Sequence, residues 1–212
     1  ETLARQSGPL ASQAPEFLRT HPVTVNRIAE SRERAMEFPR HEIADATGYS
    51  LARARLRVLS SPTPEAAIQR FSGDMSDPRK AGDIGIEYGM ALAQLQRGDF
   101  DKAREILTAL TNRNPGIIPF HTALAIAQMA SGQEAESFRT YGEAMRLFPR
   151  NVPLTVHYAE ALMQHDRAKE AHRILLDLLN SVAPTPEQVR LIALAASAAG
   201  DTGDAHYYMA EY

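Results

Sequence analysis

Apolar residues recur three or four positions apart over most of this chain, which is the spacing of one face of an α-helix. In residues 84–96 these positions are Ile84, Tyr88, Leu92 and Leu95. The side chains between them are mostly small or polar, so the pattern predicts an amphipathic helix. Similar stretches follow along the chain, and together they predict an all-α protein.

Two kinds of residue divide this pattern into helix pairs. Gly98 predicts the end of the first helix, because glycine tolerates the left-handed conformation that ends a helix. Residues 101–112 predict a second helix. It ends before Pro115, since the residue before a proline is biased away from the helical conformation. Residues 84–115 are therefore predicted to form a helix–turn–helix unit.

The same unit recurs in steps of 34 residues, with a small residue in each helix and a turn residue between the helices. The first helix carries Ala91, Ala125, Ala159 and Ala193, the second carries Ala103, Ser137, Ala171 and Ala205, and the turn carries Gly98, Gly132, Asp166 and Gly200. Two antiparallel helices that lie about 8–10 Å apart need a small side chain where they cross. The recurrence therefore predicts a stack of helix pairs.

Residues 41–83 carry two further helical segments. The first, 48–61, alternates Ala or Leu with Arg, which is compatible with a strand; strong helix formers dominate it, so a helix is preferred. The second, 63–75, has Pro64 in its first turn, where the missing N–H is not needed. We expect an irregular helix pair stacked under the first repeat, followed by a hinge or turn at 76–83.

Residues 1–40 have a different character. They contain an extended start, a turn at Thr20-His21-Pro22 and a helix for which Thr24 is the expected N-cap. Glu30 and Arg34 are spaced to form a favourable pair on the outer side of that helix. These features predict a tail that differs from the repeats.

Composition excludes several classes of function. The net charge is -3 with 44% hydrophobic and 23% charged residues, which is ordinary for a soluble folded protein and argues against nucleic-acid binding. No apolar run approaches the ~20 residues of a membrane span. The chain has no cysteine, so disulfides, thiolate nucleophiles and cysteine zinc sites are excluded.

A 34-residue helix pair with small residues at its eighth and twentieth positions and proline near its thirty-second resembles the tetratricopeptide repeat (TPR). The resemblance implies an α-solenoid with repeats near 84–117, 118–151, 152–185 and 186–212, the last one truncated. The aromatic residue that the family has at position four is replaced by Glu87, His121, Thr155 and Val189. No polar capping helix closes the array, so the natural chain is expected to continue.

The same resemblance implies which residues bind a partner. In TPR proteins the first helix of each repeat lines the concave surface, chiefly through positions two, five, nine, twelve and thirteen. Here these include Tyr88, Leu92, Leu95, Gln96, Ile126, Met129, Val156, Glu160, Met163, Gln164, Arg190 and Leu194. Only Arg190 suits the carboxylate clamp that binds chaperone C-termini. The remaining set favours an irregular apolar partner, because methionine adapts its shape and exposed apolar grooves bind proteins.

The Thr20-His21-Pro22 segment ahead of TPR repeats is similar to the end of the protease domain in periplasmic zinc metalloproteases of the beta-barrel-assembly-enhancing (BepA-like) type. The resemblance makes residues 1–40 a protease-domain remnant and linker. It implies a zinc metalloendopeptidase as the parent and a periplasmic location. The implied partners are unfolded or assembling outer-membrane proteins, their assembly complex and the parent's own protease domain, for chaperone-like folding or degradation. A stand-alone TPR scaffold unrelated to proteolysis is the alternative.

The sequence lacks the chemistry of such a protease. A zinc protease needs H-E-x-x-H on a helix, and the only His-Glu pair, His41-Glu42, has Asp45 where the second histidine should stand. We therefore expect no enzyme activity and no cofactor in this piece, with zinc only in the parent. His21 is a candidate extra ligand at the open position of that zinc; the alternative is that His21-Pro22 only shapes a turn.

Overall fold

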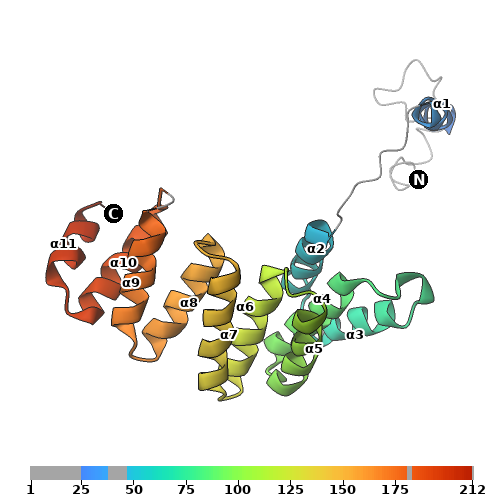
Figure 1. The fold of residues 1–212 in the computed structure, drawn as a ribbon. Helices are drawn as coiled ribbons and strands as arrows, with labels where there is room; N and C mark the ends of the chain where they lie inside the picture. The colour runs from blue at the N-terminus through green and yellow to red at the C-terminus, as the bar shows by residue number, and fades with distance from the viewer. Residues whose placement is uncertain (1–24, 38–46, 181–182, 212) are drawn as a thin grey trace. The chain divides into compact units, whose positions relative to one another are not determined.

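The structure is a computed structural model that describes residues 25–37, 47–180 and 183–211, and all secondary structure in these ranges is helical (Figure 1). The chain divides into two compact units, Glu1–Asp45 and Ala46–Tyr212. The domain boundaries that the sequence indicates, after residues 40 and 83, stay predictions.

The first unit contains one described helix, α1 (Val25–Met36). Its exposed face carries the predicted ion pair, in which Arg34 Nη2 lies 2.6 Å from Glu30 Oε1. An exposed pair of this spacing contributes only about 0.2–0.5 kcal/mol to the helix. The predicted N-cap Thr24 and the predicted zinc ligand His21 lie outside the described residues.

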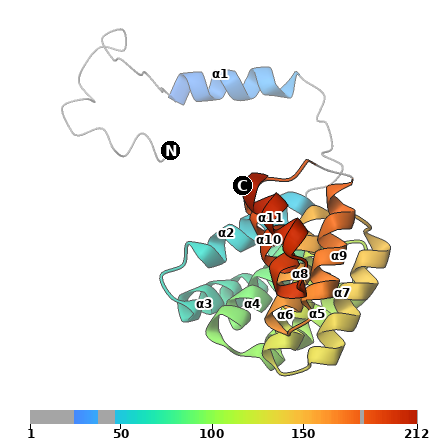
Figure 2. The same ribbon diagram turned by 90° about the vertical axis from the view of Figure 1, so that its left-hand side faces the viewer.

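The second unit contains four helix pairs whose first helices begin 34 residues apart. The pairs are α4 (Ile84–Arg97) with α5 (Phe100–Arg113), α6 (Ile118–Ala130) with α7 (Glu134–Leu147), α8 (Val152–Gln164) with α9 (Ala168–Leu179), and α10 (Pro186–Ala199) with α11 (Thr202–Glu211). Each helix packs against its neighbours in sequence (Figures 1 and 2). The predicted all-α solenoid of helix pairs is therefore confirmed.

Small side chains lie where the two helices of a pair meet. The four alanines of the first-helix register, Ala91, Ala125, Ala159 and Ala193, are each no more than 1% exposed. Ser137 in the second helix is also fully buried, and its hydroxyl donates a hydrogen bond to the Ala125 carbonyl oxygen at 2.7 Å. The register thus keeps the paired backbones close, and the one polar member of the second register is satisfied by the facing helix.

The turn register has the backbone conformation that the sequence indicates. Gly98, Gly132 and Gly200 have φ angles of 86°, 77° and 86°, and Asp166 occupies the fourth turn with φ 57°. Positive φ costs a residue with a Cβ about 1–2 kcal/mol, although aspartate tolerates it better than most. The third turn is therefore the one at which the repeat departs from its preferred residue.

Helices α2 (Thr47–Leu59) and α3 (Pro64–Met75) stand where the sequence predicts them, with Thr63 as the N-cap of α3. Both pack against α4, the first helix of the first repeat, and they contact each other less extensively. Glycine in α4 allows this arrangement. A Cβ atom on Gly89 would lie 2.3 Å from two ring carbons of Phe71, which is fully buried on α3.

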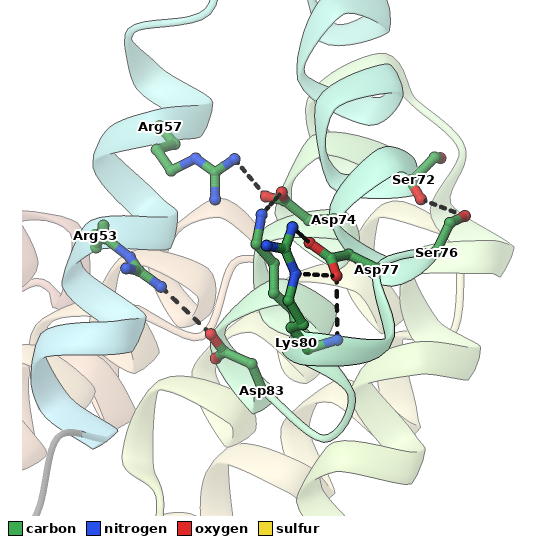
Figure 3. Close-up of polar contacts among 9 residues, drawn as sticks. Arg53, Arg57, Ser72, Asp74, Ser76, Asp77, Lys80 and Asp83 are labelled. Atoms are coloured by element: carbon green, nitrogen blue, oxygen red, sulfur yellow. Dashed lines mark hydrogen bonds and ion pairs between the residues drawn. The ribbon is translucent and has the colours of Figure 1, made fainter.

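A polar network holds α2, α3 and the following segment together (Figure 3). Asp74 lies 2.5 Å from both Arg57 Nη2 and Lys80 Nζ, and these cations hold the pKa of the Asp74 carboxyl below its usual range. Asp83 caps α4, accepts a hydrogen bond from the Ser50 hydroxyl and pairs with Arg53 at 3.3 Å. The 76–83 segment is thus bonded to α2 through Asp83 and to the end of α3 through the Lys80–Asp74 pair.

Candidate functional site

An apolar groove of about 460 Å³ crosses the first helices of successive units in the Ala46–Tyr212 part. Its walls come from α2, α4, α6 and the start of α8, so it depends on the packing of helices that are far apart in sequence. We call it the α2–α8 groove. The residues that give it its character are Leu51, Arg55, Tyr88, Leu92, Leu95, Ile126 and His157.

The floor of the α2–α8 groove belongs to the hydrophobic core. Tyr88 is 3% exposed and its ring lies 5.4 Å from that of Phe120. Leu92 and Leu95 are half-buried and pack against the same core cluster. Ile126 is 41% exposed at the edge of the groove. The groove therefore has a rigid floor and an accessible apolar edge.

Few polar groups face this groove. Burial raises the pKa of the Tyr88 hydroxyl, and the Arg55 guanidinium on α2 lowers it in part. At the other end, His157 Nδ1 lies 3.3 Å from Glu160 Oε2 on the same helix. The Asn151 side chain is occupied in capping α8, where it accepts a hydrogen bond from the Leu154 N–H. Arg55 thus adds a positive charge to a largely apolar surface.

A second pocket of about 330 Å³ lies between α8 and α10, and we call it the α8–α10 pocket. Val156 and Leu194 supply apolar surface, and Glu160 and Arg190 supply charge of both signs. Glu187 borders the pocket as well. Hydrogen bonds from its own backbone N–H and from Thr185 lower the pKa of the Glu187 carboxyl. This pocket is more polar than the groove and is suited to orienting polar groups.

The structure brings most of the sequence-predicted residues to these two sites. Tyr88, Leu92, Leu95 and Ile126 line the groove, and Val156, Glu160, Arg190 and Leu194 line the pocket. The others line neither: Gln96 and Gln164 are exposed, Met129 is half-buried, and Met163 packs into a core cluster. Whether any of these residues contacts a partner stays a prediction.

The α2 wall of the groove was missed by sequence reasoning. The register that identifies Ala91 leads, one repeat earlier, to Arg57, which is charged and paired with Asp74. The buried small residue of α2 is Ala54, which stands out of register. The 34-residue periodicity begins only at residue 84. No repeat position therefore indicated that Leu51 and Arg55 lie beside the repeats.

Two further histidines were singled out in the sequence. His121 is buried; its Nε2 lies 2.8 Å from the Pro115 carbonyl oxygen, and its ring meets Phe148 edge-on. It replaces the family's aromatic residue at position four as a packed ring. The 41–45 segment that contains His41-Glu42 lies outside the described residues.

Comparisons with known proteins point to one group. A sequence family described as tetratricopeptide repeat matches residues 128–195. A putative beta-barrel assembly-enhancing protease of Vibrio cholerae is 32% identical over 166 residues, covering 78% of this chain and 34% of the relative. The Yersinia pestis protease of that name is 26% identical over 180 residues, covering 82% and 36%. The chain spans about a third of the length of these curated relatives.

Solved structures agree on the fold. A thermophilic TPR protein of Thermus thermophilus superposes with a TM-score of 0.58 at 21% identity, over 78% of this chain and 89% of that one. Pseudomonas aeruginosa pilF superposes with a TM-score of 0.56 at 11% identity, over 78% and 74%. Within the described ranges, no helix has the length and hydropathy that crossing a bilayer requires.

Proposed function

This chain is a tetratricopeptide-repeat solenoid homologous to beta-barrel assembly-enhancing proteases over about four-fifths of its length, and from that premise we propose that it is the protein-binding region of such a protease. In this proposal it acts in the periplasm and recruits outer-membrane proteins or their assembly machinery for folding or degradation. The names of the relatives favour this role over a stand-alone scaffold.

The α2–α8 groove is the observation that carries the proposal. It is apolar and its floor consists of side chains that belong to the core or pack against it, such as Tyr88 and Leu92, so an extended segment would meet a surface that is already packed. Strands of outer-membrane barrels alternate apolar and polar residues, and their apolar side chains are exposed before insertion. Such a strand would place alternate apolar side chains on Leu95 and Ile126 while its polar side chains face solvent.

In this proposal, proteolysis belongs to parts of the full-length protease outside these 212 residues. The 212 residues contain no H-E-x-x-H sequence, which zinc proteases of this kind use for two ligands and a general base. In this proposal the solenoid also contacts the parent's own protease domain, which holds the zinc. His21 would then be an additional zinc ligand, and unchanged zinc content and proteolysis in a His21→Ala variant of the full-length protein would exclude that role.

The groove is tested with a labelled peptide of about ten residues that alternates apolar and polar residues, the pattern of a barrel strand. Ile126→Asp places a charge at the exposed edge of the groove. Loss of the apolar contact there should weaken binding by about tenfold or more, because burying an Ile side chain is worth about 1.5–3 kcal/mol. Fluorescence anisotropy measures the dissociation constant for each variant.

The matched control is Leu147→Asp, which puts the same charge on an exposed apolar residue of α7 outside the groove. It should leave the dissociation constant unchanged. A peptide of the same composition with helical spacing should bind less well than the alternating one. Equal weakening by both substitutions would show that the groove is not the site, and equal binding of both peptides would argue against barrel strands as clients.

A further inference from the structure

A histidine and two aspartates meet at the end of the array. His172 lies in α9, Asp201 lies in the turn between α10 and α11, and Asp204 lies in the first turn of α11. Each residue offers one ligand atom, and the three atoms lie within 4.8 Å of one another. The cluster thus joins two helix pairs, and it lies away from the α2–α8 groove and the α8–α10 pocket.

The histidine nitrogen in this cluster is buried and unsatisfied. His172 is 7% exposed, and its Nε2 lies 3.2 Å from Asp204 Oδ2 in a contact that lacks hydrogen-bond geometry. Among the described side chains, only this nitrogen and the Thr111 hydroxyl are buried without a hydrogen-bond partner. A buried polar atom without a partner costs about 1–3 kcal/mol, so it calls for an explanation.

The two aspartates are held in fixed positions by the turn that joins α10 to α11. Asp201 N–H donates to the Ala196 carbonyl oxygen at 2.9 Å, which closes the end of α10 at Gly200. Asp201 Oδ1 then accepts a hydrogen bond from the Asp204 N–H at 3.0 Å. These bonds fix the two residues relative to each other and hold the Asp201 carboxylate in the turn, while the Asp204 carboxylate lies against the imidazole.

We propose that His172, Asp201 and Asp204 bind one divalent transition-metal ion that joins α9 to α11. An imidazole nitrogen with two carboxylates is a donor set that Zn²⁺ accepts, at about 2.0–2.2 Å for each ligand. Ca²⁺ and Mg²⁺ prefer oxygen ligands throughout, so the nitrogen disfavours them. Asp201 is exposed, so a fourth position stays open to water or to a group from a partner.

Metal binding would account for two features of the cluster. It would satisfy the buried His172 nitrogen, and it would offset the charge repulsion between Asp201 and Asp204. It would also fasten α11, which has no buried residue of its own, to the preceding repeat. The metal would thus stabilise the last described helix pair.

Calorimetric titration of the metal-free 212-residue chain with ZnCl₂ tests the proposal. We expect one ion per chain and a thermal midpoint that rises with the zinc concentration, because a ligand that binds the native state stabilises it. Asp204→Asn should weaken binding by at least about tenfold, since even the partners of metal ligands are worth that much. The control His206→Asn changes an exposed histidine of the same helix and should keep wild-type affinity.

NMR of the wild-type chain with Zn²⁺ gives a readout that does not depend on a variant folding. The largest shift changes should fall on the His172 ring and on the Asp201–Asp204 amides. Absence of saturable binding, or unchanged binding by Asp204→Asn, would overturn the proposal. So would binding that is lost only in His206→Asn, since that result indicates an adventitious ion on the surface.

Discussion

The contact between Gly89 of α4 and Phe71 of α3 predicts that one substitution has opposite consequences at two glycines. Replacing an interior helical glycine by alanine ordinarily stabilises a helix by about 0.8–1.0 kcal/mol. Gly142 in α7 meets this condition, because a Cβ there has nothing within 4 Å. At Gly89 the added Cβ would lie 2.3 Å from two Phe71 ring carbons, far inside ordinary contact distance.

The cost of that contact can be estimated from the structure. Phe71 is fully buried within the core cluster, so a shift of its ring would push against other core side chains, and overpacking of this kind costs about 1–3 kcal/mol. The propensity gain is the same at both sites and cancels in the comparison. Gly89→Ala should therefore be less stable than Gly142→Ala by about 1–3 kcal/mol.

Urea unfolding of the 212-residue chain, followed by far-ultraviolet circular dichroism, measures both variants. A Phe71→Leu background supplies the double-mutant cycle, in which Gly89→Ala should cost less because the ring carbons are removed. If Gly89→Ala and Gly142→Ala agree within about 0.5 kcal/mol, the close approach of α3 to α4 is wrong. The close approach is also wrong if Gly89→Ala lowers the free energy of unfolding equally in the wild type and in the Phe71→Leu background.

Two further predictions concern a turn and the polar network. Asp166 has a φ of 57°, so Asp166→Gly should stabilise the protein and Asp166→Ala should destabilise it by about 1 kcal/mol in urea unfolding. An Ala variant as stable as the wild type would contradict the strained turn. Asp74→Asn should destabilise the protein at neutral pH, and the difference should shrink below about pH 4. The pKa of Asp74 is lowered in the folded protein, so its ionised form contributes stability that is lost as acid protonates the carboxyl. If the urea midpoints of the wild type and Asp74→Asn differ by the same amount at every pH, the prediction is wrong.

Local chemistry determined which parts of this sequence are predictable. The 34-residue register placed four helix pairs because crossing alanines such as Ala125 and turn residues such as Gly98 are required within each unit. These requirements recur wherever the unit recurs, so they can be read from one sequence. The start of α3 was equally predictable, since Thr63 and Pro64 act on the first turn alone.

The binding surface was predictable only where it follows the register. Tyr88 and Ile126 occupy repeat positions and reach the groove, whereas Met163 occupies a comparable position and packs into the core. Which member of a helix face stays accessible depends on the neighbour that covers it. That information lies in how successive pairs stack, and periodicity alone does not contain it.

By itself, the sequence determined the helices, their turns and the repeat that pairs them, because these depend on residues that are near one another along the chain. Only the tertiary structure decided that α2 forms a wall of the groove and that His172 meets Asp201 and Asp204. Those contacts join segments separated by about 30 residues or more, with no spacing rule between them. They arise because packed helices bring distant side chains into the same few ångströms.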